Sequence, residues 1–101
     1  MAAPGLNVID PAALPPAQPV RLGTLLDYAP GAVVSRALAK ANGGSVTLFS
    51  FDAGQELSEH AAPFDALVEV LDGEVELVIG GQPVVARAGE TVLMPASVPH
   101  A

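Results

Sequence analysis

Cysteine is absent from this sequence, and both aromatic and basic residues are few. Without cysteine the chain has no disulfide framework and no thiolate chemistry, which fits a reducing cytoplasm. With one tyrosine and three phenylalanines, any core must be built mainly from valine, leucine and alanine. Half of the residues are hydrophobic, so the composition is that of a chain with a packed core.

The charge balance is strongly acidic. Eleven acidic residues stand against four basic ones, with a formal net charge of −7, and the basic residues are Arg21, Arg36, Lys40 and Arg87. Because they are scattered, no patch exists that would neutralise several phosphates, so nucleic acid is not expected as a partner. An anionic membrane surface is excluded as a partner for the same reason.

Long apolar runs are missing as well. No stretch approaches the roughly 18 consecutive apolar residues that a membrane-spanning helix needs. Residues 1–11 have neither the basic start nor the apolar segment of a secretory signal peptide. We therefore expect a soluble cytoplasmic protein.

The chain is long enough for one small domain. Five of its ten prolines fall in residues 1–19, so this segment is predicted to be either a flexible leader or an arm over a neighbouring subunit. Residues 20–101 are predicted to form the domain. A domain of this size buries only about 60–65% of its unfolded surface, so association into a homodimer would stabilise it.

Short stretches separated by turn signals make up this domain. Residues 20–28 are expected to form either a short strand or one helical turn. Strands are predicted at residues 33–39, 45–51, 66–71, 74–79, 82–87 and 91–94. Many short strands without helical periodicity predict an all-β fold, a sandwich or a barrel.

Two turn signals, Asp72-Gly73 and Gly80-Gly81, divide residues 66–87 into a predicted three-strand meander. In this register Glu69 lies opposite Glu76, and Arg87 lies opposite Glu74 as a cross-strand ion pair. One face is uniformly apolar and is predicted to point to the interior; its members are Ala66, Val68, Val70, Val75, Leu77, Ile79, Val84 and Ala86. The opposite face should be covered in part by a second sheet or a dimer interface, because it also carries Leu67, Leu71, Val78 and Val85.

Two segments resemble the motifs of the cupin family. The first family motif is a glycine, five residues, His-x-His, three or four residues, a glutamate, six residues and a glycine. The second is a glycine, five residues, Pro-x-Gly, two residues and a histidine. The spacing from Gly54 to His60, and from Gly89 through Pro95 to His100, fits both. The resemblance covers about residues 33–101 and implies a small single-domain cupin, a jelly-roll barrel (RmlC-like, a double-stranded β-helix), in a group mostly of unassigned function.

Metal-binding cupins use three histidines and one glutamate, and the resemblance supplies only part of this set. His60 matches the first histidine and His100 the last, so these two are the candidate metal ligands. Ala62 stands at the second histidine position and Ala66 at the glutamate position. The glycine of Pro-x-Gly is replaced by Ser97.

A divalent metal (zinc, iron, manganese or nickel) on these two histidines would need further ligands. Water, a bound substrate or a nearby side chain would have to supply them; the nearby side chains are Gln55, Glu56, Glu59 and Asp65. A loop-capping role is the alternative for Asp65. The alternative for the whole site is a metal-free pair that binds a ligand or only forms hydrogen bonds.

Three functions are compatible with these residues. The first is a protein that binds a small organic ligand, with or without the metal. The second is a metal-dependent enzyme of the dioxygenase or isomerase type, in which the metal acts as Lewis acid or oxygen activator. The third is a non-catalytic dimerisation or regulatory module. Binding is favoured over catalysis because Ala62 and Ala66 remove half of the usual ligands, and no catalytic residue is assigned.

Cupins of this kind usually continue beyond the last histidine with a closing strand, whereas this sequence ends one residue after His100. We expect either that the chain is truncated and lacks this strand, or that the N-terminal segment or a second subunit takes its place. An uncovered edge at His100 would favour aggregation, so strand exchange or tight dimerisation is predicted.

Overall fold

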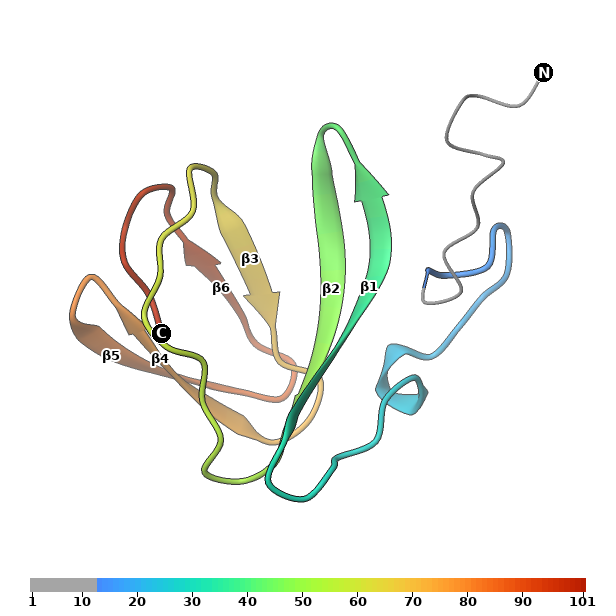
Figure 1. Ribbon diagram of the computed structural model, residues 1–101, viewed down its shortest axis with the longest axis horizontal. Helices are drawn as coiled ribbons and strands as arrows, with labels where there is room; N and C mark the ends of the chain where they lie inside the picture. The colour runs from blue at the N-terminus through green and yellow to red at the C-terminus, as the bar shows by residue number, and fades with distance from the viewer. Residues whose placement is uncertain (1–12) are drawn as a thin grey trace. The chain divides into compact units, whose positions relative to one another are not determined.

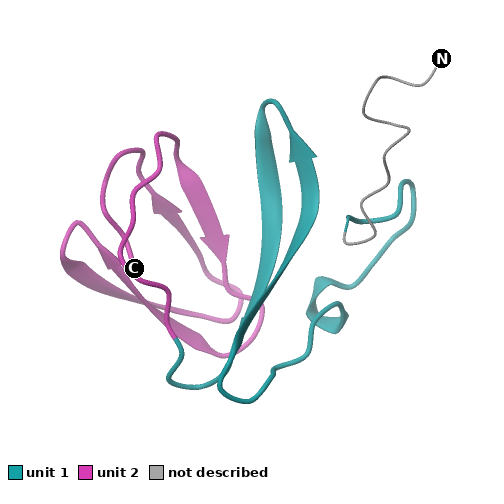
Figure 2. Ribbon diagram, viewed as in Figure 1, with its two compact units in different colours: residues 1–55 teal, residues 56–101 magenta. Residues whose placement is uncertain are grey.

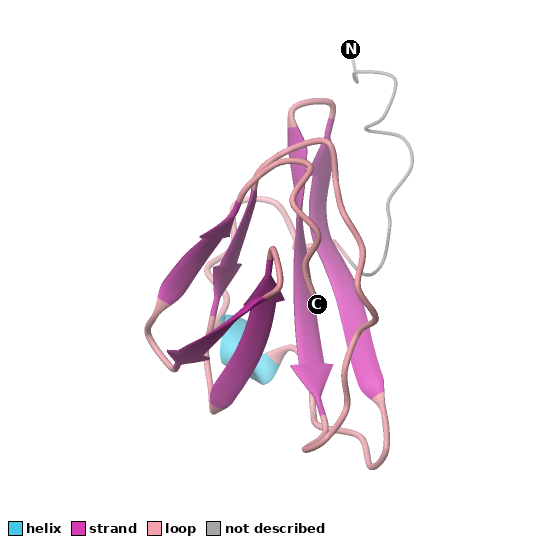
Figure 3. Cartoon of the chain, turned by 90° about the vertical axis from the view of Figure 1, so that its left-hand side faces the viewer, coloured by secondary structure: helices cyan, strands magenta, loops and turns pink. Residues whose placement is uncertain are grey.

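The computed structural model describes residues 13–101, which form strands joined by loops and one short helical turn (Figures 1 and 3). The 3-10 helix η1 spans Leu22–Thr24, so residues 20–28 contain the helical turn and not the strand. The strands are β1 (Val33–Ala41), β2 (Gly44–Phe51), β3 (Ala66–Glu69), β4 (Glu74–Ile79), β5 (Gln82–Arg87) and β6 (Thr91–Met94). The predicted all-β fold and the positions of its strands are confirmed. In the described part of the chain no helix is long and apolar enough to cross a membrane.

The chain divides into two compact units, residues 1–55 and 56–101 (Figure 2). The first unit contains an antiparallel hairpin of β1 and β2, whose register shifts by one residue between Ala37 and Ala39. Leu38 is therefore the extra residue of a β-bulge; it is buried, and its carbonyl accepts the N–H of Leu14 at 2.9 Å. This bond ties residue 14 of the predicted leader to β1, whereas residues 1–12 of that leader lie outside the described residues.

The second unit is one long hairpin that turns at Gly80-Gly81 and bends once along its length. Next to the turn, β4 pairs with β5, beginning with Ile79 opposite Gln82. Beyond the bend, β3 pairs with β6, ending with Ala66 opposite Met94. The two arms of the hairpin are thus β3 followed by β4, and β5 followed by β6.

The predicted meander is wrong in its first pairing, because Asp72-Gly73 forms the bend and not a hairpin turn between β3 and β4. Val70 donates its N–H to the Glu90 carbonyl at 2.9 Å and accepts the Gly89 N–H at 2.8 Å. The backbone N–H and carbonyl of Val70 are therefore both hydrogen-bonded to the other arm of the hairpin and do not pair with β4. Consequently Glu69 pairs with Thr91 and not with Glu76.

The predicted inner face is nonetheless found. Along β3 and over residues 74–77 and 83–87 the less exposed positions alternate with exposed ones, and the exposed ones include Leu67 and Glu69. Val70, Leu77 and Ala86 are buried on the inner face, as is Met94 of β6. The alternation of side chains between two faces is a property of each strand by itself. The prediction of the inner face was therefore correct even though the predicted pairing of β3 with β4 was wrong.

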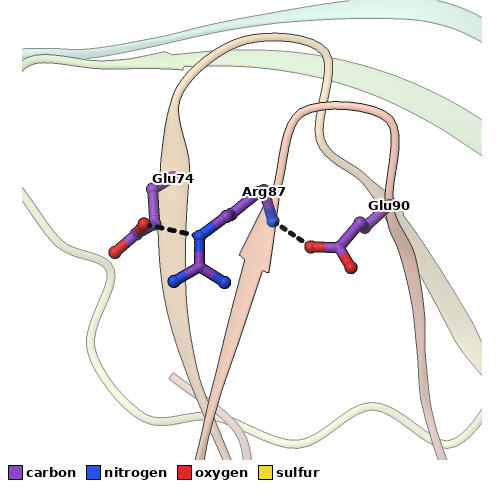
Figure 4. A network of polar contacts seen from close by, with 3 residues as sticks. All are labelled: Glu74, Arg87 and Glu90. Carbon is purple, nitrogen blue, oxygen red and sulfur yellow. Dashed lines mark hydrogen bonds and ion pairs between the residues drawn. The ribbon is translucent and has the colours of Figure 1, made fainter.

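Arg87 lies at the bend between two carboxylates (Figure 4). Its Nε is 3.1 Å from Glu74 Oε2, which confirms the predicted cross-strand ion pair, and its backbone N–H donates to Glu90 Oε1 at 2.7 Å. Both side chains of the ion pair are more than half exposed. Such a pair contributes at most about 1 kcal/mol, so its main effect is to favour this register at the bend.

Gly80 should be less tolerant of substitution than its neighbour Gly81. Both have a left-handed backbone, but a Cβ on Gly80 would lie 3.3 Å from Val98 Cγ1, whereas one on Gly81 would meet nothing within 4 Å. Each alanine substitution should lower the free energy of unfolding by about 0.5–1 kcal/mol, which is the strain of a left-handed backbone less the entropy that glycine loses on folding. Gly80→Ala should lower it further because of the added contact. Urea unfolding measures both.

The double variant Gly80→Ala, Val98→Ala is the control for this contact. If the contact causes the extra loss, the double variant should lose less stability than the sum of its two single substitutions. Equal losses in Gly80→Ala and Gly81→Ala would contradict the prediction.

Candidate functional site

The structure brings together the two histidines that the motif spacing singled out. The backbone N–H of His60 donates to the His100 carbonyl at 2.9 Å, and the N–H of His100 donates to the His60 carbonyl at 2.8 Å. On the other side, Ala101 exchanges two hydrogen bonds of 2.9 Å with Val78 at the end of β4. The backbone around His100 is therefore bonded on both sides within this chain, and its edge is not open.

The side chains of both histidines lie on the apolar inner face. His100 forms antiparallel bridges with His60 and with Ile79, and opposite residues in such a bridge project to the same side. Ile79 belongs to the predicted inner face. His100 is only 6% exposed, whereas His60 is exposed, so the pair has a buried member and a member that solvent reaches.

The two imidazoles touch through their Nε2 atoms. These atoms are 3.0 Å apart, and the rings meet edge to face with centroids 4.3 Å apart. In each ring Nδ1 contacts the carbonyl two residues earlier: Ser58 at 2.9 Å for His60, and Val98 at 3.2 Å for His100. A carbonyl only accepts hydrogen bonds, so each Nδ1 carries a proton and each Nε2 of a neutral ring keeps its lone pair.

The lone pairs of two neutral rings whose Nε2 atoms are 3.0 Å apart repel unless the two atoms share a proton or bind one cation. Histidines that bind metals usually donate the other ring N–H to a carbonyl or carboxylate, as both rings do here. Two nitrogens bound to one tetrahedral Zn²⁺ at 2.0–2.1 Å stand roughly 3.3 Å apart. The donor atoms therefore suit a divalent metal in kind and in spacing.

The number of donors is small for a metal site. Among residues 13–101 no group of three or more histidine, cysteine, aspartate or glutamate side chains is placed to hold a metal ion. Glu56 and Glu59, suggested by the sequence as further ligands, thus form no such group with the histidines. Ala66 lies on the inner face where the family pattern has a glutamate, and Glu69 is exposed on the other face. A metal held here would take its other ligands from water or from a bound molecule.

Asp65 and Ser97 belong to the loops that lead from β3 and β6 to the two histidines. Asp65 Oδ1 accepts the Ala96 N–H at 2.8 Å, which is the loop-capping role. Ser97 has a φ of 65°, in the left-handed region that favours glycine. This left-handed conformation explains in physical terms why the family pattern has a glycine at this position. The match of Ser97 to the glycine of Pro-x-Gly was therefore the signal that predicted an unusual backbone here.

Comparison with known proteins supports the fold described above. The model of the family described as "Cupin domain" matches residues 47–101. A conserved protein of unknown function from Streptococcus pyogenes is 32% identical with a TM-score of 0.80, and the match covers 86% of this chain and 76% of that one. A cupin superfamily protein from Desulfitobacterium hafniense is 30% identical with a TM-score of 0.79, over 86% and 80% of the two chains.

A third solved structure, a cupin 2 conserved barrel domain protein from Leptotrichia buccalis, is 38% identical with a TM-score of 0.76. That match covers 77% of this chain and 38% of the longer chain. Comparison with curated proteins gave no match.

Replacing Ser97 by glycine should stabilise the protein. A left-handed backbone costs an L-residue roughly 1–2 kcal/mol, whereas a glycine loses about 0.5–1 kcal/mol more conformational entropy on folding. We expect Ser97→Gly to raise the free energy of unfolding by about 0.5–1 kcal/mol, measured by urea denaturation. Ser97→Ala keeps the strained backbone and should give no gain; a loss of stability in Ser97→Gly would show that the hydroxyl group matters more than the strain.

Proposed function

The chain belongs to the cupin family, and we propose that it binds a small organic ligand at the His60–His100 pair through a weakly held divalent metal. The observation that carries this proposal is the 3.0 Å distance between the two Nε2 atoms. In both rings Nδ1 contacts a backbone carbonyl, so Nε2 is the nitrogen with the lone pair. A cation between these atoms removes the repulsion of their lone pairs and uses both as ligands. The net charge of −7 further supports a cation, because it raises the concentration of cations near the protein.

The surroundings of the pair support a largely apolar ligand with an oxygen donor. The inner face that carries both imidazoles also carries Leu77 and Ala86, which are buried. The second unit has one basic residue, Arg87, and its guanidinium group is paired with Glu74. Within this unit an anionic group of the ligand would therefore have the metal as its cationic partner.

The metal would be held by His60 and His100 and would polarise a bound oxygen as a Lewis acid. The site keeps open positions, because two protein nitrogens leave room for water and for donors of the ligand. The small number of protein ligands supports reversible binding of a metal–ligand complex more than it supports a permanent catalytic centre. Zinc, iron, manganese and nickel all accept imidazole nitrogen, so the proposal covers each of them.

Titration of the full chain with Zn²⁺ should show one weak site. Calorimetry should give about one metal per chain, and His60→Ala and His100→Ala should each lower the affinity at least about ten-fold, because each removes one of two protein ligands. Glu76→Ala removes an exposed carboxylate of β4 and should leave the affinity nearly unchanged. Affinity that is equal in the wild type and in both histidine variants would refute the metal site.

We also propose that the protein forms a homodimer, as its small size already suggests. Leu67 of β3 and Leu93 of β6 are cross-strand partners on the outer face, and their side chains are 73% and 52% exposed. A second copy that covered these side chains would remove apolar surface from water, at about 25 cal/mol per Å². The pair itself is uncharged, and the nearest carboxylate on the same face of β3 is that of Glu69.

Light scattering after size exclusion should give the mass of two chains for the wild type. Leu67→Glu should shift the protein toward the monomer because it puts a charge into the proposed contact. Val46→Glu is the matched control, since Val46 is 55% exposed on β2 of the other unit. A wild-type protein that stays monomeric at all concentrations tested would exclude the homodimer.

A further inference from the structure

Besides the backbone exchange between His60 and His100 themselves, two hydrogen bonds join the loop that carries His60 to the loop that carries His100. Asp65 Oδ1 accepts the Ala96 N–H at 2.8 Å, and the Ala62 carbonyl accepts the Ser97 N–H at 2.7 Å. Both donors lie just after β6, and both acceptors lie just before β3. The two bonds therefore lie between the paired strands β3 and β6 and the histidine pair.

Asp65 extends the pairing of these strands by one connection through its side chain. The last backbone pair of β3 and β6 is Ala66 with Met94; Asp65 is the next residue on one arm, and Ala96 follows Met94 after Pro95 on the other. A carboxylate that accepts a backbone N–H forms a charge-assisted bond, which is about twice as strong as a bond between neutral groups. The start of the loop at residue 95 is thus anchored to the start of β3.

This anchor holds Ser97 in an unfavourable conformation. A non-glycine residue with a φ of 65° persists only where the surrounding structure fixes it, and here the N–H groups of residues 96 and 97 are both bonded to the other loop. Without the Asp65 bond, one of the two bonds that fix this backbone is lost, and only the bond from the Ser97 N–H to the Ala62 carbonyl opposes relaxation of Ser97 to a negative φ. The path of the three residues that lead to His100 would then change.

We infer that Asp65 is a positioning residue, which sets the approach of the His60 and His100 imidazoles by clamping the loop at Ala96. It acts through the backbone and does not itself touch a ligand. The inference rests on the proposed function only for the statement that the positioned pair binds a metal; the contact between the rings is independent of it.

Asp65→Asn separates this role from that of a metal ligand. The amide oxygen of asparagine still accepts the Ala96 N–H, whereas its neutral group is a poor substitute for a carboxylate ligand. Asp65→Ala removes the acceptor. Glu69→Ala is the matched control, since it removes a carboxylate that is exposed on β3, four residues further along the chain.

The first measurement is the nuclear Overhauser contact between carbon-bound ring protons of the two imidazoles, without added metal. The chain contains only two histidines, so the signal can be assigned without ambiguity. We expect the contact in the wild type, in Asp65→Asn and in Glu69→Ala, and we expect it to be lost or strongly weakened in Asp65→Ala. If Asp65→Ala does not fold, Asp65→Leu, which is close to aspartate in shape but lacks the acceptor, replaces it.

The second measurement is the affinity for Zn²⁺. It should fall about ten-fold or more in Asp65→Ala, as expected for the loss of an outer-shell support, and it should be within about two-fold of the wild type in Asp65→Asn. An unchanged ring contact in Asp65→Ala, or a ring contact absent from the wild type, overturns the positioning role. Wild-type protein that shows the Asp65-dependent ring contact but binds no Zn²⁺ refutes the proposed metal and leaves the positioning role standing.

Discussion

The reciprocal backbone exchange between His60 and His100 is the constraint on which the site depends. It fixes two residues that are 40 positions apart as opposite members of one bridge, and opposite members project to the same side. Each imidazole is then oriented locally, through the carbonyl two residues before it. The convergence of the two Nε2 atoms follows from these two facts together, and the proposed clamp of Asp65 on Ala96 holds the loop on which they depend.

Much of the fold can be predicted from the sequence because its signals are local. The alternation that places Val68 or Leu77 inward is visible within one strand, and Gly80-Gly81 supplies the positive φ of the tight turn. The bend at Asp72-Gly73 has the same chemistry as a hairpin turn, so the residues of the turn do not distinguish the two. The distinction comes from the bonds of Val70 to residues 89 and 90, which are distant in sequence.

Some features of the candidate site can likewise be predicted from the sequence, and others cannot. His60 and His100 are predictable because their spacing from Gly54 and Gly89 fits the cupin motifs, and the loss of the glutamate at Ala66 is predictable from the same spacing. The contact of Asp65 with Ala96 is not, because it joins two loops 31 residues apart and an aspartate before a strand has many local uses. The need for a left-handed residue at position 97 was present only as the glycine of the family pattern.

A cation shared by the two imidazoles can be located directly by anomalous diffraction at the zinc absorption edge, on crystals of the full chain grown with Zn²⁺. The proposed site requires one anomalous peak on the inner face, within bonding distance of Nε2 of both His60 and His100. It is contradicted if the two rings stand in contact as described with no peak between them, or if zinc is found only at other residues.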